Sequence, residues 1–227
     1  MKALILAAGF GTRLRPLTNK IPKCLVQIKG VPLLEIWLEK LTTLKVSKIL
    51  LNTHYLPNQV INFIANSKYK DITKIINEKV LLGTAGTLLK NIDDLLDEEC
   101  ILLHADNYTK ADIGDLIKAH NNRPDNCLIT ILIFETNNPS SCGIVELSDN
   151  IVINIHEKIS NPPSNLANGA IYILSKDALK IIKNEFPKAN DFVRDILIHF
   201  LGKIYTYHTK EIFLDIGTPE NYLKANT

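Results

Sequence analysis

The chain has 227 residues, of which 46% are hydrophobic and 22% are charged, and its formal net charge is +2. This composition is typical of a folded globular protein, and the near balance of charge leaves no basic stripe for binding nucleic acid. No apolar run approaches the roughly 18 residues of a membrane-spanning helix, and the N-terminus lacks the pattern of a signal peptide. We therefore expect a soluble, cytoplasmic protein whose partners include neither nucleic acid nor membrane.

The first 134 residues alternate between short apolar runs and segments whose apolar residues recur at helical spacing. The runs predict strands at 2–7, 49–52, 74–77, 100–104 and 128–134. The segments between them predict helices over 33–44, from Pro57 onward, over 84–96 and over 111–120. Strands separated by helices of this length indicate βαβ units. We therefore expect parallel strands whose carboxyl ends gather on one edge and bind the ligand there.

After Phe134 the pattern changes. Strand-like segments occur at 143–147, 151–155 and 170–174, and the absence of a helix between the first two predicts an antiparallel excursion. Helices over 175–185 and 191–200, a strand over 203–207 and a helix beginning at Thr218-Pro219-Glu220 complete the pattern. Because no linker, repeat or low-complexity segment interrupts the chain, we expect residues 1–227 to form a single domain.

The cysteines Cys24, Cys100, Cys127 and Cys142 have no CxxC pair and no metal-ligand spacing. Cys100 and Cys127 stand beside apolar runs, where a cysteine is usually a small buried hydrophobic residue. We therefore expect no metal site built on cysteine.

The segment from Leu6 to Leu14, which reads Leu-Ala-Ala-Gly-Phe-Gly-Thr-Arg-Leu, directly follows the first predicted strand. Its glycines let the backbone approach a phosphate chain, and Arg13 and Lys23 supply cations nearby. A dinucleotide fingerprint needs a third glycine where Leu14 stands, and a P-loop needs Gly-Lys-Ser/Thr where Thr12-Arg13-Leu14 stands. Both motifs are excluded. The segment is either a phosphate-binding loop of another kind or a plain tight turn with an exposed arginine.

Residues 6–18, followed by Pro22-Lys23, resemble the signature of the sugar-phosphate nucleotidyltransferase family, and the similarity continues across essentially the whole chain. The resemblance implies an α/β fold with a Rossmann-like three-layer core and a mixed, mostly parallel sheet. It also implies a Mg²⁺-dependent transfer of a nucleoside monophosphate from an NTP to a sugar 1-phosphate. In this loop region it implies nucleotide contacts at Leu6, Ala7, Ala8, Gly9, Gly11, Thr12, Arg13 and Lys23.

Two aspartates from distant parts of the chain, Asp106 and Asp215, each stand at the end of an apolar strand. Carboxylate oxygens suit Mg²⁺, which is usually held by one or two carboxylates together with substrate phosphates and water. Taken singly, either aspartate is as often a loop or capping residue. The resemblance implies a metal-binding aspartate at both positions, with Ala105 where the family usually has glycine.

Further segments resemble parts of the family that contact the substrates. Gly83-Thr84-Ala85-Gly86 resembles the segment that packs against the base and ribose, which implies nucleotide contacts at Gly83, Thr84 and Gly86. Glu157-Lys158 resembles a Glu-Lys pair whose ammonium holds the acceptor phosphate. The residues implied to bind the sugar phosphate are Asn107, Gly143, Glu157, Lys158 and Asn168. The residues implied to act in catalysis are Arg13, Lys23, Asp106 and Lys158.

The identity of the substrates stays open at this stage. The resemblance favours GTP and a manno-configured sugar or heptose phosphate, giving GDP-mannose or GDP-heptose for surface polysaccharides. Uridylyl- and thymidylyltransferases have similar segments, and cytidylyltransferases for phosphocholine-like acceptors share the N-terminal loop. The alternative outside the enzymes is a nucleotide-sensing module that has no catalytic activity. Dimers are common in the family, and the sequence does not decide whether this chain forms a homodimer.

Overall fold

The computed structural model describes all residues from Met1 to Thr227. They form two compact units, each assembled from separate stretches of the chain. Unit 1 comprises Met1–Leu82, Leu103–Lys110 and Ile212–Thr227, and unit 2 comprises Gly83–Leu102 and Ala111–Glu211. Neither unit contains a helix with the length and hydropathy that crossing a lipid bilayer requires. The single domain expected from the sequence stays a prediction.

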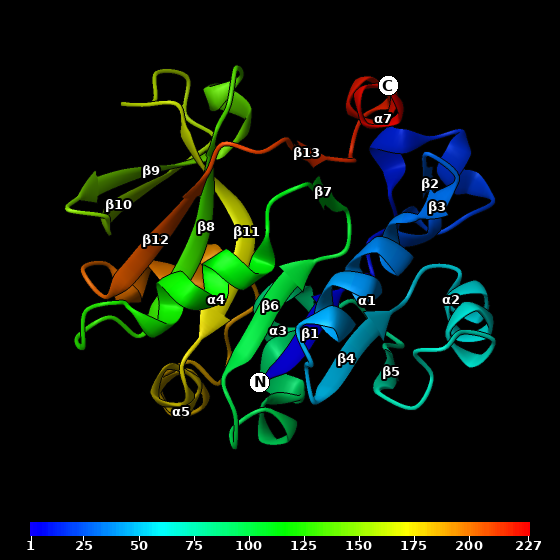
Figure 1. The fold of residues 1–227 in the computed structure, drawn as a ribbon, viewed down its shortest axis with the longest axis horizontal. Helices are drawn as coiled ribbons and strands as arrows, with labels where there is room; N and C mark the ends of the chain where they lie inside the picture. The colour runs from blue at the N-terminus through cyan, green and yellow to red at the C-terminus, as the bar shows by residue number, and fades with distance from the viewer. The chain divides into compact units, whose positions relative to one another are not determined.

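Unit 1 contains parallel strands in the order β5-β4-β1 (Figure 1). The strands are β1 Lys2–Leu6, β4 Lys48–Thr53 and β5 Thr73–Asn77. The connections between them carry α1 Leu33–Thr43 and α2 Pro57–Ala65. The predicted βαβ arrangement is thus confirmed in this unit. Because the strands are parallel, the residues that follow Leu6, Thr53 and Asn77 gather at one edge.

The amphipathic pattern of α1 decides which face of that helix is buried. Leu33, Leu34, Trp37, Leu38 and Leu41 are each at most 1% exposed. Trp37 belongs to this core, and its indole Nε1–H donates a hydrogen bond to the Asn107 carbonyl oxygen at 2.7 Å. A buried indole N–H needs such an acceptor, so α1 also fixes the backbone just after Asp106.

The strand β6 Cys100–His104 begins in unit 2 and ends in unit 1. Just beyond its end, the Ala105 N–H donates to the Leu6 carbonyl oxygen at 2.9 Å. This hydrogen bond places Asp106 beside the end of β1, where the glycine loop begins.

Several short elements complete unit 1. Two short antiparallel pairs join β2 Gln27–Ile28 to β3 Val31–Pro32 and β7 Asn107–Thr109 to β13 Phe213–Asp215. Single 3₁₀ turns are η1 Thr12–Leu14, η2 Leu17–Asn19 and η3 Lys23–Leu25. The final helix is α7 Pro219–Asn226, and Thr218 caps it by accepting the Asn221 N–H, as the Thr-Pro-Glu pattern predicts.

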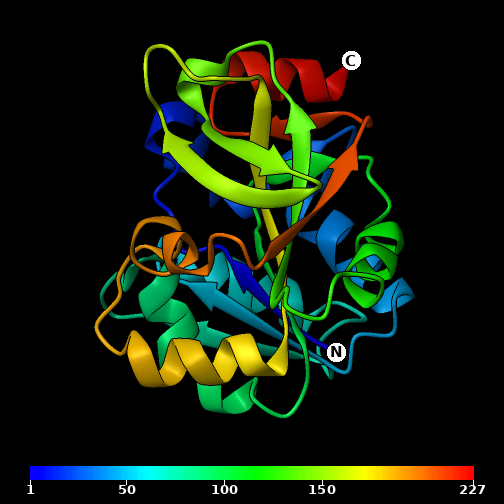
Figure 2. The ribbon, with the colours of Figure 1, turned by 90° about the vertical axis from the view of Figure 1, so that its left-hand side faces the viewer.

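Unit 2 contains strands in the order β11-β8-β12-β10-β9, and Figure 2 shows the curved β9–β10 pair. The strands are β8 Ile129–Glu135, β9 Gly143–Ser148, β10 Ile151–Glu157, β11 Leu166–Leu174 and β12 Ile204–Thr209. Only β12 and β8 are parallel; β11 with β8, β10 with β12 and β10 with β9 are antiparallel. The sheet is therefore mixed, as predicted, and its antiparallel part extends beyond the expected hairpin to β11.

The helices of unit 2 are α3 Gly83–Lys90, α4 Ile113–Asn121, α5 Lys176–Glu185 and α6 Phe192–Asp195. The 3₁₀ turns are η4 Ile92–Asp94, η5 Pro139–Ser141 and η6 Leu197–Phe200.

Three predicted boundaries in unit 2 are wrong. The helix predicted over 84–96 ends at Lys90, because the Asn91 N–H bonds to Leu88 and the chain tightens into a 3₁₀ turn. The helix predicted over 191–200 breaks at Ile196, whose ψ is −60° at φ −124°. The strand predicted to begin at residue 170 begins at Leu166, so Asn168 lies within β11.

Candidate active site

The glycine loop follows β1 and is shaped by Gly11. Gly11 has φ 64°, and a Cβ at this position would lie 3.0 Å from Thr18 Cγ2. Its carbonyl oxygen accepts the Thr18 hydroxyl at 2.7 Å and the Leu14 N–H at 3.0 Å. At Gly9, by contrast, no atom lies within 4 Å of a built Cβ, so its backbone is open to an approaching ligand. Glycine is thus needed for the turn at Gly11, whereas Gly9 leaves open space beside the backbone.

Aromatic side chains hold the loop from the end of β4. The Phe10 ring makes edge contacts with His54 and Tyr55, at centroid distances of 5.5 and 5.7 Å. The Tyr55 hydroxyl donates to the Thr18 carbonyl oxygen at 2.9 Å. These contacts restrain the loop on the side that carries Phe10. Among the other loop residues expected to bind nucleotide, Leu6 ends β1, Ala8 is buried and Thr12 begins η1.

The charged residues predicted in unit 1 come together in one cluster. The Lys23 ammonium donates to Asp106 Oδ2 at 2.5 Å and to Asp215 Oδ1 at 3.2 Å. Arg13 Nη2 lies 3.4 Å from Asp215 Oδ2. The side chain of Lys23 is only 10% exposed, whereas that of Arg13 is 67% exposed. Lys23 is therefore a buried link between the two carboxylates, and Arg13 extends into solvent.

The surroundings of the cluster set the protonation of its groups. Burial raises the pKa of Asp106, but the Lys23 ammonium, His104 and hydrogen bonds outweigh burial and hold that pKa below its ordinary value. Burial is also the main reason why the pKa of the neighbouring Cys24 thiol rises to about 12. At neutral pH the cluster therefore holds a charged carboxylate at Asp106 beside an inert thiol.

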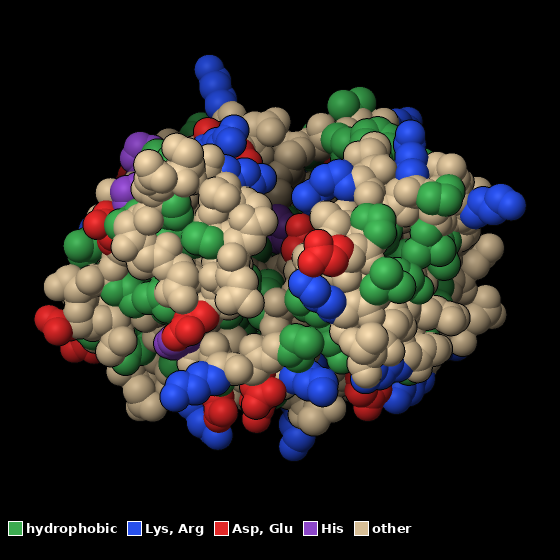
Figure 3. Space-filling model, turned by 90° about the horizontal axis from the view of Figure 1, so that it is seen from above, with side chains coloured by type: hydrophobic (Ala, Val, Ile, Leu, Met, Phe, Trp, Pro, Cys, Tyr) green, Lys and Arg blue, Asp and Glu red, His purple; other side chains and the backbone are tan.

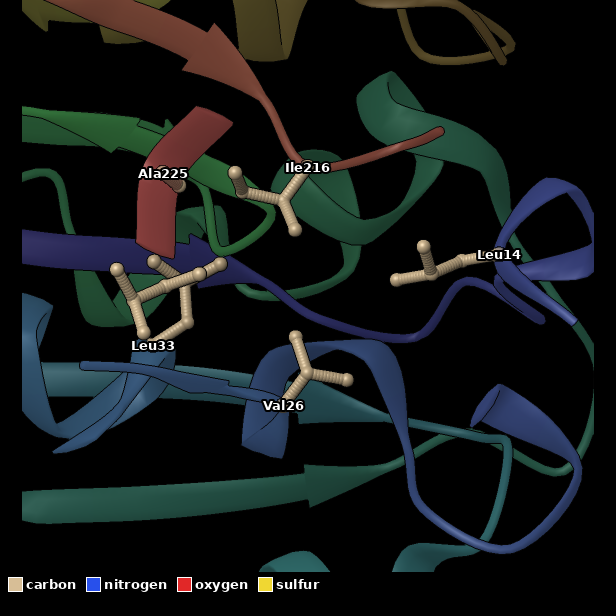
Figure 4. Close-up of a cluster of buried hydrophobic side chains, with 6 residues drawn as sticks. Leu14, Val26, Leu33, Ile216 and Ala225 are labelled. Atoms are coloured by element: carbon tan, nitrogen blue, oxygen red, sulfur yellow. The ribbon is translucent and has the colours of Figure 1, made fainter. Parts of the chain in front are cut away.

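A buried apolar cluster holds these charged residues in place (Figure 4). It contains Leu14, Val26, Ile28, Leu33, Ile216 and Ala225. Leu14 follows Arg13 and Ile216 follows Asp215, so each charged residue has a buried neighbour in the chain. Gly217 adds a steric condition, because a Cβ there would lie 2.8 Å from both Arg13 Nη2 and Asp215 Oδ1.

The two aspartates fit the ligand chemistry of Mg²⁺ in part. Their carboxylates point to one cation, the Lys23 ammonium, so their oxygens already share a position where positive charge is favoured. No group of three or more His, Cys, Asp or Glu side chains suited to a metal is present. Two carboxylates would suit a Mg²⁺ ion whose remaining ligands are water and phosphate oxygens.

Of the residues expected to hold the acceptor, Asn107 lies in unit 1 and Gly143, Glu157, Lys158 and Asn168 lie in unit 2. Glu157 is the last residue of β10, and Lys158 follows it with φ 51°. The Lys158 N–H donates to the Cys142 carbonyl oxygen at 3.2 Å, which ties it to the start of β9. A Cβ on Gly143 would collide with Glu157 Oε1, so glycine makes room for that carboxylate. Burial raises the pKa of Glu157 against the opposing effect of Lys158.

Asn168 and the Gly83–Gly86 segment are also fixed within unit 2. The Asn168 amide donates from Nδ2 to the Tyr172 hydroxyl at 2.9 Å and accepts the Ala170 N–H at 2.8 Å. Thr84 Oγ1 accepts the Phe192 N–H at 2.7 Å. Gly83 has φ 75° and packs so closely on Asn190 that a Cβ would collide. Gly86 lies within α3, and Asn107 lies in β7, paired with Asp215.

The distribution of charged side chains on the surface is consistent with the near balance of charge in the sequence. On the face that Figure 3 shows, lysine and arginine side chains are interspersed with aspartate and glutamate. No continuous basic surface of the kind that tracks a nucleic-acid backbone appears on that face.

The sequence model of the Nucleotidyl transferase family matches residues 2–227. The chain belongs to this family. A putative mannose-1-phosphate guanyltransferase of Sulfolobus acidocaldarius is 31% identical over 229 residues, which cover 100% of this chain and 62% of that protein. Mannose-1-phosphate guanylyltransferase 1 of Arabidopsis thaliana is 31% identical over 238 residues, covering 98% and 63%. This chain therefore spans less than two thirds of the length of these curated relatives.

Solved structures of similar proteins match almost end to end. The crystal structure of HddC from Yersinia pseudotuberculosis has a TM-score of 0.82 and 30% identity, covering 99% of this chain and 97% of that one. The same protein complexed with GMP-PN has a TM-score of 0.81. A putative glucose-1-phosphate thymidylyltransferase from Bacillus anthracis has a TM-score of 0.86 at 22% identity, covering 100% and 94%, which is a likeness of fold alone. The mixed α/β fold predicted from the sequence is confirmed.

The sequence patterns do not single out Asn52 or Gly217, two residues that adjoin the candidate site. Asn52 is buried near the end of β4 and bonds to the glycine loop, and Gly217 adjoins the Arg13–Asp215 pair. A polar residue within the apolar strand 49–52 is the signal that points to Asn52. No local pattern singles out Gly217, because its constraint comes from Arg13, which is far away in the sequence.

Proposed function

We propose that this member of the nucleotidyltransferase family transfers a nucleoside monophosphate from an NTP to a sugar 1-phosphate and so forms an NDP-sugar. The family membership supports the reaction class, and the names of the curated relatives support a sugar phosphate as acceptor. The observation that carries the proposal is the Lys23 ammonium shared by Asp106 and Asp215 beside the glycine loop.

In the proposed reaction, an oxygen of the acceptor phosphate bonds to the α-phosphorus of the NTP. The bond from that phosphorus to the bridging oxygen breaks, and its electron pair leaves with pyrophosphate. A phosphate monoester is already anionic at neutral pH, so no general base is required and catalysis depends on positioning and charge.

The residues of unit 1 are proposed to bind the triphosphate. Backbone N–H groups of the loop would contact the phosphates, and the open space at Gly9 permits a close approach. Arg13 and Lys23 would stabilise the charge that develops on the leaving pyrophosphate. Asp106 and Asp215 would hold Mg²⁺, whose contribution when bound is to neutralise and orient phosphate oxygens.

The residues of unit 2 are proposed to bind the acceptor and the base. Lys158 would hold the acceptor phosphate, and Asn168 would read sugar hydroxyls, for which its amide offers both a donor and an acceptor. Glu157 and Gly143 of unit 2, together with Asn107 of unit 1, would complete the sugar-phosphate contacts. Gly83, Thr84 and Gly86 would pack against the base and ribose, where glycine allows a flat ring to come close.

We propose GTP as the nucleotide and a manno-configured sugar or heptose 1-phosphate as the acceptor. The names of the guanylyltransferase relatives and the GMP-PN complex of HddC support guanine as the base. The homodimer and the cytoplasmic location expected from the sequence stay predictions.

Pyrophosphate release, measured with each of the four NTPs against a panel of sugar 1-phosphates and phosphocholine, tests the proposal. Release with GTP and mannose 1-phosphate or a heptose 1-phosphate supports it in full. Release only with UTP, dTTP or CTP keeps the reaction and overturns the base. Release with phosphocholine alone overturns the sugar, and no release with any acceptor favours a nucleotide-sensing role.

A further inference from the structure

A chain of hydrogen bonds links the glycine loop to the segment that leads to Gly83, entirely within unit 1. The Ala7 N–H donates to Asn52 Oδ1 at 2.6 Å, and Asn52 Nδ2 donates to Glu78 Oε1 at 3.1 Å. The other carboxylate oxygen of Glu78 accepts the Leu82 N–H at 3.4 Å. Three separate stretches of chain are thus joined: the end of β1, β4 and the loop after β5.

The two central residues of this chain are buried and held on more than one side. Asn52 is 3% exposed and Glu78 is 2% exposed. The Glu78 backbone is fixed as well, because its N–H donates to the Thr53 carbonyl oxygen at 2.8 Å and its own carbonyl lies 2.8 Å from His54 Nδ1. A buried carboxylate is costly unless hydrogen bonds satisfy it, and a satisfied buried network specifies one arrangement of the groups it joins.

We call the chain of hydrogen bonds from Ala7 through Asn52 and Glu78 to Leu82 the relay. Its two ends determine which side-chain groups must donate and which must accept. Both ends are backbone N–H groups, of Ala7 and Leu82, so each needs an acceptor. Asn52 supplies an acceptor on one side and a donor on the other, and the Glu78 carboxylate then accepts from both directions. An asparagine paired with a carboxylate is one arrangement that satisfies this pattern, and a carboxylate at position 52 paired with an amide at position 78 is the other.

We propose that Asn52 and Glu78 are positioning residues, which set the spacing between the glycine loop and the segment before Gly83 and thereby position the nucleotide. Neither is required to touch the substrate. The inference rests on the proposed function, which assigns the glycine loop to the phosphates and Gly83, the residue after Leu82, to the base and ribose.

Exchange of the two side-chain types tests the relay. Asn52→Asp alone places two carboxylates side by side. In Glu78→Gln alone, the new amide N–H₂ group faces either the N–H₂ group of Asn52 or the Leu82 N–H, so one donor loses its acceptor. The double variant Asn52→Asp/Glu78→Gln restores a donor and an acceptor for every link and keeps one negative charge. We expect each single variant to lower kcat/KM for the NTP by at least about tenfold and the double variant to return to within about threefold of wild type, since directly bonded pairs couple strongly.

The pH dependence of Asn52→Asp adds a readout that a merely structural role would not move. Two adjacent buried carboxylates share a proton and raise one pKa, and the protonated carboxyl can donate in place of the lost amide. The activity of this variant relative to wild type should therefore rise as the pH falls from 9 to 5. His54, which contacts the Glu78 carbonyl oxygen, and Lys79, which follows Glu78 in the sequence, are titratable groups present in every variant, so the comparison with wild type controls for them. Asn52→Ala is the matched control and should show no such rise.

Three results would overturn the inference. Near-normal kcat/KM in both single variants would show that the relay positions nothing. A double variant as impaired as Glu78→Gln would show that the Glu78 carboxylate acts directly on the ligand. A change confined to the acceptor KM would place the effect elsewhere.

If wild type turns over no NTP, the proposed function fails separately. NTP affinity measured by calorimetry across the same variants then tests the relay in place of kcat/KM, and an unchanged affinity in the single variants would overturn the inference.

Discussion

Individual side chains of unit 1 show how one ammonium can organise two carboxylates that are far apart in the sequence. Lys23 is separated from Asp106 by 83 positions and from Asp215 by 192, and it bonds to both. Lys23 is mostly buried, so its ammonium needs a neighbouring carboxylate. If one of the two aspartates is removed, the other is left to neutralise that charge. Under the proposed function, we expect the charge balance of the cluster, rather than any single contact, to determine how well phosphate and Mg²⁺ would bind there.

Asp106→Asn should therefore abolish most activity without unfolding the protein. The substitution keeps the shape of the side chain, and Asp215 still accepts from Lys23, so we expect the thermal transition to persist. We expect kcat to fall by about 10²–10³, the usual effect of removing one electrostatic contact from an active site. Asp125→Asn, at an exposed position, is the control. Near-normal kcat in Asp106→Asn would remove this residue from the proposed metal site.

Lys158→Ala should act on the acceptor alone. Loss of a charge-assisted hydrogen bond to phosphate costs about 1.5–3 kcal/mol, so the acceptor KM should rise roughly ten- to a hundredfold while the KM for the NTP stays the same. Steady-state kinetics with each substrate varied in turn measure both constants, and Lys188→Ala provides an exposed lysine of unit 2 as control. An unchanged acceptor KM would exclude Lys158 from the acceptor site.

Gly9→Ala should change binding of the NTP without changing the stability of the fold. A Cβ at Gly9 meets no protein atom within 4 Å, so the free energy of unfolding should change by less than about 0.5 kcal/mol. The same methyl group would occupy the space through which a phosphate approaches the backbone, so the KM for the NTP should rise. Urea unfolding and NTP kinetics on the same preparation check both statements. An NTP KM equal to that of wild type would mean that no phosphate approaches at Gly9.

At the level of elements, the buried cluster around Ile216 joins α7 and β13 to the glycine loop. Its members come from both ends of the chain, and Figure 4 shows Leu14 and Ile216 directed toward the same region. The short antiparallel pair β7–β13 places Asp215 opposite Asn107, next to Asp106. Packing and pairing together therefore bring the two carboxylates to Lys23.

Ile216→Ala should reveal this connection as a loss of both stability and activity. Ile216 is fully buried, and truncation of such a residue to alanine costs about 2–5 kcal/mol, compared with about 0.5–1.5 kcal/mol for Ile216→Val. Urea unfolding of the two variants gives the free energies, and kcat of the folded fraction should fall in the same order. If Ile216→Ala were stable and fully active, the cluster would not be what positions Asp215.

On the scale of the whole molecule, each unit is built from stretches that are not contiguous in the sequence. Unit 1 needs its final stretch, Ile212–Thr227, to complete both the apolar cluster and the charged cluster. Contacts between such distant stretches form only at a high cost in chain entropy, so the folded unit depends on gaining all of them together.

Deletion of residues 212–227 should therefore prevent unit 1 from folding cooperatively. The shortened chain lacks β13 and α7, and less surface would be exposed on unfolding, so the urea m-value should fall and NTP binding should be lost. Deletion of Thr227 alone removes one exposed residue and serves as the control. An m-value equal to that of the full chain would show that unit 1 forms without its final stretch.

The local patterns of the sequence predicted most elements correctly. Apolar runs located β1, β4, β5 and β6, and helical spacing located α1, because periodicity depends only on neighbouring residues. The predictions failed where the local signal was weak or overridden. The helix after Asp191 breaks at Ile196, and the strand containing Asn168 starts four residues earlier than its apolar run. The three-residue strands β7 and β13 are too short to carry any periodicity.

The sequence by itself determined the class of fold, the glycine loop and, through family resemblance, the residue types of the candidate site. Only the tertiary structure decided that Lys23 lies between Asp106 and Asp215, that Gly217 must lack a side chain, and that Asn52 bonds to both the glycine loop and Glu78. The physical reason is that strand and helix patterns repeat over a few residues. Contacts between residues tens to hundreds of positions apart depend on how the apolar surfaces pack, and no local spacing records that packing.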